Sequence, residues 1–210
     1  MNLVKYRLNT NILKTFLLVF IGTILLTISA KIKIPFYPVP MTMQTFVVLF
    51  LGLSFGYKIG LATVGLYLLE GIIGFPVFSN SPEKGIGLIY FTGPTMGYLI
   101  GFLFTVYFAG SFNFSKNLFI KFLQLLFSVS FIYILGVLWL GTLIGWEKSL
   151  FQIGVQPFLL AELFKILIVL VSFSIPLEFN PVAFAFSDEL YTGCKAATCS
   201  FSFGFSSKSG

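Results

Sequence analysis

The chain has 210 residues, of which 57% are hydrophobic and only 10% are charged, and its formal net charge is +6. Soluble domains carry roughly 25% charged residues, so this composition excludes an ordinary globular protein. The cations stand singly near the ends of apolar stretches, a pattern typical of membrane topology signals and not of a nucleic-acid-binding surface. The apolar runs are continuous, which favours membrane-spanning helices over the alternating strands of a β-barrel.

Six apolar segments approach or reach the roughly 17–25 residues that a membrane-spanning helix requires. They are Ile12–Ala30, Met41–Phe55, Gly56–Gly74, Gly93–Gly110, Leu118–Ile144 and about Phe158–Ile175. The second segment is short, and almost no loop separates it from the third. We therefore predict an all-α integral membrane protein with one six-helix domain, residues 1–175, followed by a poorly ordered tail, residues 176–210.

Lysine and arginine residues predict the orientation, because they are more frequent in cytoplasmic segments. With the N-terminus in the cytoplasm, the inner side carries Lys5, Arg7, Lys14, Lys58, Lys116 and Lys121, and the outer side carries Lys31, Lys33, Lys84 and Lys148. Three connections then lie outside: Lys31–Pro40, Phe75–Thr92 and Trp146–Pro157. The second is the longest and is rich in turn residues, so we expect any binding face to be on the outer side.

Small residues recur at every fourth position of the fourth segment. They are Gly93, Gly97, Gly101, Thr105 and Ala109. This spacing allows two helix backbones to approach closely. Packing inside the protein's own bundle is the favoured interpretation, and a docking surface for a partner subunit is the alternative.

Glu70, Glu162 and Lys165 are the candidate functional residues among the ionisable ones inside apolar segments, where charge is costly and is often functional. Glu70 lies about one turn from the outer end of the third segment, where it forms either a pocket wall or a structural hydrogen bond. Glu162 and Lys165 are three residues apart, so they share one face of a helix. They are either a self-neutralising ion pair or a donor and acceptor directed into a cavity, and the second interpretation is favoured.

The sequence gives little support for a metal site or for enzymatic activity. Histidine is absent, and the two cysteines, Cys194 and Cys199, lie together near the C-terminus. We therefore expect no metal site, no cofactor and no enzymatic activity. An intramembrane enzyme that uses Glu70 or Glu162 as a base, and a purely structural membrane subunit, remain as rival classes.

Three strings carry a family resemblance: PFYPVPMTMQT at residues 35–45, GFPVF at 74–78 and FTGPTMGYLIGF at 91–102. In this order and at these separations they resemble the BioY family, the biotin-specific substrate-binding (S) components of energy-coupling-factor (ECF) transporters. The likeness covers Lys31–Ala109 and resumes at Pro157–Lys165. It departs from the family pattern P-G-D-x-x-K, because Leu160, Ala161 and Glu162 stand where the family has Pro, Gly and Asp. Lys165 matches directly.

The resemblance implies a multi-pass protein of the bacterial cytoplasmic membrane that binds biotin from outside with high affinity. Its implied partners are a transmembrane coupling protein and two cytoplasmic ATPase subunits. The chain contains no GxxxxGK[ST] phosphate-binding loop, so it could not hydrolyse ATP itself. Because the P-G-D string is altered, an S component for another small carboxylated vitamin or precursor is the alternative.

A biotin site needs an apolar slot, an acceptor for the ureido N–H groups and donors for the ureido and carboxylate oxygens. Glu162 can accept and Lys165 can donate. The predicted substrate-binding residues are Glu162, Lys165, Asn80, Tyr98, Gly93, Phe78 and Gln44. We expect the outer connections Lys31–Pro40 and Phe75–Thr92 to form a lid over this pocket. The alternative is that Pro35, Pro38 and Pro40 only set a tight turn.

Overall fold

The computed structural model describes residues 2–34, 39, 41–83, 85–112, 117–147 and 149–174, and for residues 2–12, 34 and 174 it describes only the backbone. The chain divides into two units, Met1–Ile175 and Pro176–Gly210. The predicted tail, residues 176–210, lies outside the described residues. The elements below all belong to the first unit.

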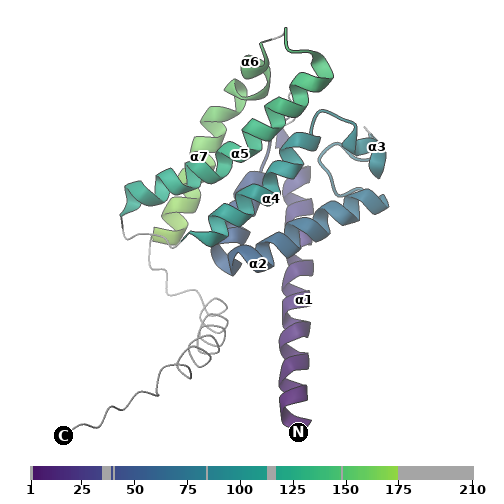
Figure 1. The fold of residues 1–210 in the computed structure, drawn as a ribbon, viewed down its shortest axis with the longest axis vertical. Coiled ribbons are helices and arrows are strands. Elements are labelled where there is room, and N and C mark those ends of the chain that lie inside the picture. The colour runs from purple at the N-terminus through teal and green to yellow at the C-terminus, as the bar shows by residue number, and fades with distance from the viewer. Residues whose placement is uncertain are drawn as a thin grey trace, which may run out of the picture. The chain divides into compact units, whose positions relative to one another are not determined.

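Helices make up most of the described chain, as Figure 1 shows. In order, the elements are α1 (Asn2–Lys31), β1 (Lys33–Ile34), β2 (Met41–Thr42), α2 (Gln44–Ile73), α3 (Leu88–Phe91), α4 (Met96–Ser111), α5 (Leu118–Ile144), α6 (Leu150–Gly154) and α7 (Gln156–Ser174). Four stretches within the described residues are long and apolar enough to cross a membrane: Leu13–Lys31, Gln44–Ile73, Leu118–Ile144 and Gln156–Phe173. Helix α4 is apolar but shorter. The protein is therefore a multi-pass membrane protein.

Helix α2 contains a sharp reversal at Gly56. The φ of this residue is 74° and its ψ is 171°, a conformation that favours glycine because it has no side chain. In a straight helix, residues eight apart are separated by about 12 Å. A Cβ added to Gly60 would instead lie 3.6 Å from the Cα of Gly52, so the two halves of α2 fold back on each other. The boundary predicted between Phe55 and Gly56 coincides with this reversal.

The predicted start of the second helix, at Met41, is wrong. Met41–Thr42 is strand β2, which pairs antiparallel with β1 so that Lys33 is opposite Thr42 and Ile34 is opposite Met41. Pairing with β1 across this short hairpin overrides the local preference of these residues, and the helix begins at Gln44. Helix α4 likewise begins at Met96 and not at Gly93, whereas α5 has the predicted bounds.

Helix α4 packs between α2 and α5 through its small residues (Figure 1). A Cβ added to Gly97 would overlap the carbonyl oxygen of Leu135, and one added to Gly101 would lie 2.6 Å from the Cα of Ile132. The Thr105 hydroxyl donates to the carbonyl of Ser128 at 2.9 Å. Ala109 is fully buried. The preferred interpretation of the small-residue repeat, close packing within the bundle, is confirmed.

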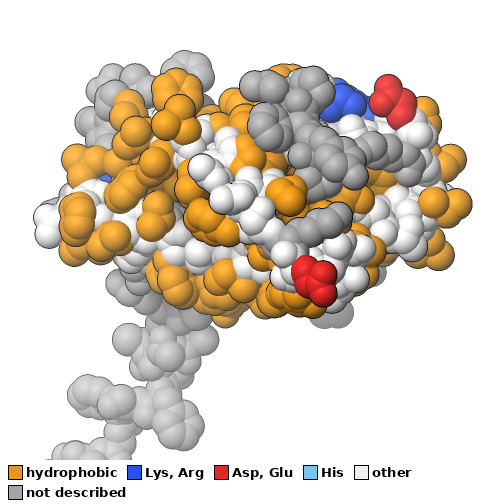
Figure 2. All heavy atoms as spheres, turned by 90° about the horizontal axis from the view of Figure 1, so that it is seen from above, with side chains coloured by type: hydrophobic (Ala, Val, Ile, Leu, Met, Phe, Trp, Pro, Cys, Tyr) orange, Lys and Arg blue, Asp and Glu red, His pale blue; other side chains and the backbone are white. Residues whose placement is uncertain are grey.

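Large apolar side chains cover much of the outer surface of the described helices. On α1 they include Phe16, Phe20 and Ile24, and on α7 they include Leu160 and Phe164. In the view of Figure 2, hydrophobic side chains dominate the described surface and charged ones are few. Such exposure suits contact with lipid, because a soluble protein rarely leaves large continuous apolar patches in water.

Replacing Gly101 by Ala should destabilise the protein by about 1–3 kcal/mol, because the new methyl group forces α4 and α5 apart. Thermal unfolding in detergent measures the effect. Gly65→Ala is the matched control, because a Cβ added to Gly65 would have no neighbouring atom within 4 Å. Equal unfolding temperatures for the two variants would contradict the packing role of Gly101.

Candidate functional site

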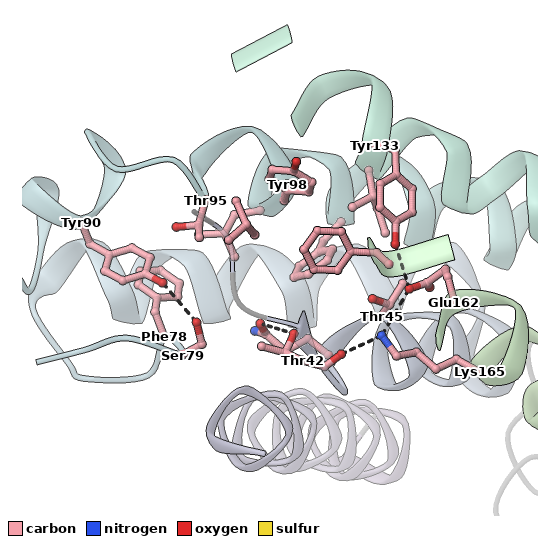
Figure 3. Close-up of a pocket in the computed structure, with 16 residues that line it drawn as sticks. Thr42, Thr45, Phe78, Ser79, Tyr90, Thr95, Tyr98, Tyr133, Glu162 and Lys165 are labelled. Carbon is pink, nitrogen blue, oxygen red and sulfur yellow. Dashed lines mark hydrogen bonds and ion pairs between the residues drawn. The ribbon is translucent and has the colours of Figure 1, made fainter. Parts of the chain in front are cut away.

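A cavity lies among α2, α4, α5 and α7, beside the segment that follows α2. Nine of its sixteen lining residues are aromatic or aliphatic, and seven are polar or charged. Figure 3 shows the lining residues. They are Val39, Thr42, Gln44, Thr45, Phe78, Ser79, Tyr90, Thr95, Tyr98, Leu99, Phe102, Ile132, Tyr133, Phe158, Glu162 and Lys165.

One end of the cavity carries a buried ion pair on α7. Glu162 is 4% exposed and Lys165 is 5% exposed, and the Lys165 Nζ lies 3.2 Å from the Glu162 Oε2. Their spacing of three residues places both on the helix face that lines the cavity. Removing two charges from water is costly, and their mutual attraction offsets that cost only when further hydrogen bonds satisfy them. The other hydrogen-bond partners of Glu162 and Lys165 therefore determine whether the pair has an atom left to bind a ligand.

The hydrogen bonds that the described residues make with Glu162 and Lys165 leave one carboxylate oxygen of Glu162 without a donor. The Tyr133 hydroxyl donates to Glu162 Oε2 at 3.1 Å, and the Lys165 ammonium donates to the Thr42 carbonyl at 2.7 Å (Figure 3). The other carboxylate oxygen, Glu162 Oε1, is buried and has no hydrogen-bond partner among the described residues. Buried polar atoms are rarely left unpaired, so this oxygen is suited to an N–H group of a ligand.

The opposite end of the cavity is aromatic. The ring of Phe78 stacks on that of Tyr90, with centroids 4.6 Å apart and planes inclined by 24°. Tyr67 meets Phe78 edge-on at 5.4 Å. The Ser79 hydroxyl lies 3.5 Å from the Tyr90 hydroxyl. Figure 3 shows this group across the cavity from Glu162 and Lys165, so the site has a charged end and an aromatic end.

Two further predicted residues lie on the cavity wall between these ends. The amide of Gln44 donates to the Tyr67 hydroxyl at 2.7 Å, and its oxygen accepts from the Thr42 hydroxyl at 3.2 Å. The hydroxyl of Tyr98 donates to the carbonyl of Gly154 at 3.0 Å. These bonds fix both side chains as preformed parts of the wall.

The cavity thus brings together five of the seven residues predicted from the sequence, namely Gln44, Phe78, Tyr98, Glu162 and Lys165. Asn80 and Gly93 are not among the lining residues. Asn80 Oδ1 instead accepts a hydrogen bond from Lys33 Nζ at 3.0 Å, and the carbonyl of Gly93 accepts one from the Trp139 indole at 2.9 Å.

Glu70 does not line the cavity either. Its Oε1 accepts a hydrogen bond from the Thr23 hydroxyl of α1 at 3.1 Å. Of the two interpretations left open by the sequence, the structural hydrogen bond between helices is the one observed.

Tyr133 is a lining residue that the sequence analysis missed. It lies in the interior of the long apolar helix α5, where its ring meets Tyr98 edge-on at 6.4 Å. A tyrosine hydroxyl in such a helix usually finds a hydrogen-bond partner, and this was the available signal. The partner, Glu162, lies 29 residues away and could not be identified from spacing alone.

The two connections that are predicted to lie outside and to form a lid are joined by lysine side chains. Lys31 Nζ donates to the carbonyls of Phe78 and Ser81, each at 2.9 Å, and Lys33 Nζ donates to the carbonyl of Ser79 at 2.8 Å. Val39, in the first connection, lines the cavity. Residues 35–38 and 40, which include all three prolines of the lid prediction, lie outside the described residues.

Comparison with known protein families shows to which family this chain is related. The model of the BioY family matches residues 3–180, which is most of the chain. The chain belongs to the BioY family. The match extends on both sides of the segments that carry the resemblance in the sequence, residues 31–109 and 157–165.

Individual BioY relatives agree with this assignment. The biotin transporter BioY of Thermotoga maritima is 35% identical over 149 residues, which cover 70% of this chain and 86% of the relative. The probable biotin transporter BioY of Pyrococcus horikoshii is 33% identical over 148 residues, with the same two coverages, 70% and 86%. A crystal structure of the S component for biotin from an ECF-type ABC transporter superposes with a TM-score of 0.66 at 29% identity, and covers 78% of this chain and 90% of that one.

Removing only one member of the buried pair should destabilise this BioY protein strongly. Lys165→Met leaves the Glu162 carboxylate buried without its countercharge, at an expected cost of about 3–5 kcal/mol. The double variant Glu162→Gln/Lys165→Met removes both charges and should recover part of that loss. Thermal unfolding in detergent without ligand compares the two. A double variant no more stable than Lys165→Met would show that the charges are not coupled.

Proposed function

We propose that this chain is the biotin-binding S component of an ECF-type vitamin transporter and captures biotin with high affinity from the outer side of the membrane. BioY proteins are transporter S components and not enzymes. One observation of this chain carries the proposal: Glu162 Oε1, which has no hydrogen-bond partner among the described residues, belongs to a carboxylate beside the Lys165 ammonium in a cavity between helices. The cavity combines aromatic and aliphatic wall residues with convergent polar groups, as small-molecule sites usually do.

The charge of the pair favours the ureido group of biotin at this end of the cavity. Glu162 and Lys165 together are neutral, so they suit a neutral group that both donates and accepts. A ureido N–H can donate to Glu162 Oε1, and the ureido oxygen can accept from Lys165. Two of the three Lys165 N–H groups already have acceptors, the carbonyl of Thr42 and Glu162 Oε2, which leaves one for the ligand. A ligand carboxylate placed here would be repelled by Glu162.

The remainder of biotin is a thioether ring and a short aliphatic chain that ends in a carboxylate. The aromatic end of the cavity, at Phe78 and Tyr90, offers apolar surface to that part. The hydroxyls of Ser79 and Tyr90, 3.5 Å apart, are polar groups at that end. We place the carboxylate on this side, away from Glu162, because like charges then lie at opposite ends of the site.

The proposed topology has six membrane-spanning segments with the N-terminus in the cytoplasm, in the bacterial cytoplasmic membrane. The six segments are α1, the two arms of α2 on either side of Gly56, α4, α5 and α7. For uptake, the chain assembles with an ECF module that we expect to consist of a transmembrane coupling protein and two ATPase subunits. An S component for another small carboxylated vitamin is the second candidate, because Glu162 is one methylene longer than the aspartate typical of the family.

Purified protein in detergent should bind biotin in calorimetry or radiolabel assays and should not bind thiamine, riboflavin or lipoate with comparable affinity. Lys165→Ala should weaken biotin binding by about 1–3 kcal/mol, because it removes a charged donor from a desolvated site. Lys58→Ala, which alters an exposed lysine near the Gly56 reversal, is the control and should bind as the wild type does. Preference for another vitamin would favour the second candidate, and an unchanged affinity of Lys165→Ala would remove this lysine from the site.

Tyr133→Phe should lower biotin affinity by roughly 0.5–1.5 kcal/mol, because it deletes the hydrogen bond that orients Glu162 but keeps the ring. Tyr57→Phe, on an exposed part of α2, controls for loss of a hydroxyl. The same binding assay measures both. If Tyr133→Phe binds as tightly as the control does, the hydroxyl has no part in orienting the carboxylate.

A further inference from the structure

Phe78 and Ser79, the first two residues of the segment Phe78–Ser81, line the aromatic end of the cavity. All four of its residues are buried, with exposed fractions from 1% for Phe78 to 9% for Asn80. It belongs to no helix or strand. Its backbone carbonyls therefore need partners outside regular secondary structure, because a buried carbonyl without a hydrogen bond is costly.

The Phe78 carbonyl accepts from the backbone N–H and the hydroxyl of Ser81, and two ammonium groups supply further partners to the segment. Lys31 Nζ donates to the carbonyls of Phe78 and Ser81, and Lys33 Nζ donates to the carbonyl of Ser79 and to Asn80 Oδ1, at distances of 2.8–3.0 Å. Each of the four residues thus gives one acceptor to a lysine. Hydrogen bonds from a charged donor are about twice as strong as neutral ones. We call Lys31 and Lys33 the lysine clamp.

The clamp fixes the path of the backbone and, through it, the Phe78 ring. That ring packs against Tyr90 and Tyr67, and a Cβ added to Gly71 would overlap it. A small shift of the 78–81 backbone would therefore bring the ring into collision with its neighbours or withdraw it from the cavity wall. Neither lysine of the clamp lines the cavity itself.

The clamp is also bonded to the charged end of the site. Lys33 pairs with Thr42 across the β1–β2 hairpin, and the Thr42 carbonyl accepts the hydrogen bond from Lys165. One continuous set of bonds thus runs from the aromatic wall, through the clamp and the hairpin, to the ion pair. Both ends of the cavity are held by the same short hairpin.

We infer that Lys31 and Lys33 are positioning residues for ligand binding, which hold the 78–81 segment against the bound ligand and thereby slow its release. The inference rests on the proposed function, since biotin is the ligand that it concerns. The lysines act through the backbone that they fix and do not contact the ligand.

The test compares Lys31→Met/Lys33→Met with the wild type in lipid nanodiscs. Methionine keeps an unbranched apolar stem and removes the ammonium donors. Without ligand, hydrogen–deuterium exchange of residues 77–81 should become faster while exchange in α4 stays unchanged. With radiolabelled biotin, the dissociation rate should rise roughly ten-fold and the association rate should change less, because the deleted hydrogen bonds hold the wall against a ligand that is already bound.

Two further variants separate positioning from a general loss of stability. Lys31→Arg/Lys33→Arg keeps charged donors and should restore much of the slow release. Lys33→Met alone removes only the bonds to Ser79 and Asn80, and serves if the double variant fails to fold. Lys58→Met, whose ammonium lies over the Tyr57 ring at 6.0 Å, is the matched control for a lost lysine.

Unchanged exchange in residues 77–81 would overturn the clamp itself. Faster exchange together with wild-type dissociation would overturn its role in ligand retention. If the wild type does not bind biotin, the proposed function fails, while the exchange measurement without ligand still decides whether the lysines hold this segment.

Discussion

The fold is arranged around one costly interaction, a carboxylate and an ammonium buried 3.2 Å apart within an apolar helix. Glu162 and Lys165 are tolerated there because α5 contributes the Tyr133 hydroxyl and the β1–β2 hairpin contributes the Thr42 carbonyl. The pair is therefore satisfied only when α5, α7 and the hairpin are all in place. Its incomplete satisfaction by the described residues, at Glu162 Oε1, is the observation on which the proposed ligand site rests.

Packing of the remaining helices supplies the rigidity that this site needs. The small residues of α4 bring its backbone against α5 and α2. The wall residues Tyr98, Leu99 and Phe102 therefore belong to a helix that is tightly packed on two sides. A bonded cavity wall reduces the conformational entropy that is lost when a ligand binds. Close packing of the helix backbones is therefore expected to increase the affinity for a ligand.

The sequence predicted what depends on local pattern and missed what depends on contacts between distant residues. The bounds of α5, the reversal at Gly56 and the inward face of Glu162 and Lys165 follow from apolar length, glycine and helical spacing. The β1–β2 pairing could not be inferred, because two residues per strand give no periodicity. Tyr133 is ordinary in an apolar aromatic helix until Glu162 is placed beside it. Asn80 lies next to the cavity wall in sequence, but its side-chain oxygen accepts from Lys33.

The reversal at Gly56 has a consequence for the depth of the site. The arm of α2 before it, residues 44–55, is only about 18 Å long, whereas the hydrocarbon layer of a bilayer is about 30 Å thick. With Gly56 at the inner surface, as the proposed orientation requires, this arm stops well short of the outer headgroups. In that orientation Gln44 and Thr45, which begin this arm and line the cavity, lie below the level of the phospholipid glycerols. In the proposed topology, a ligand bound in this cavity would therefore lie at the depth of the acyl chains.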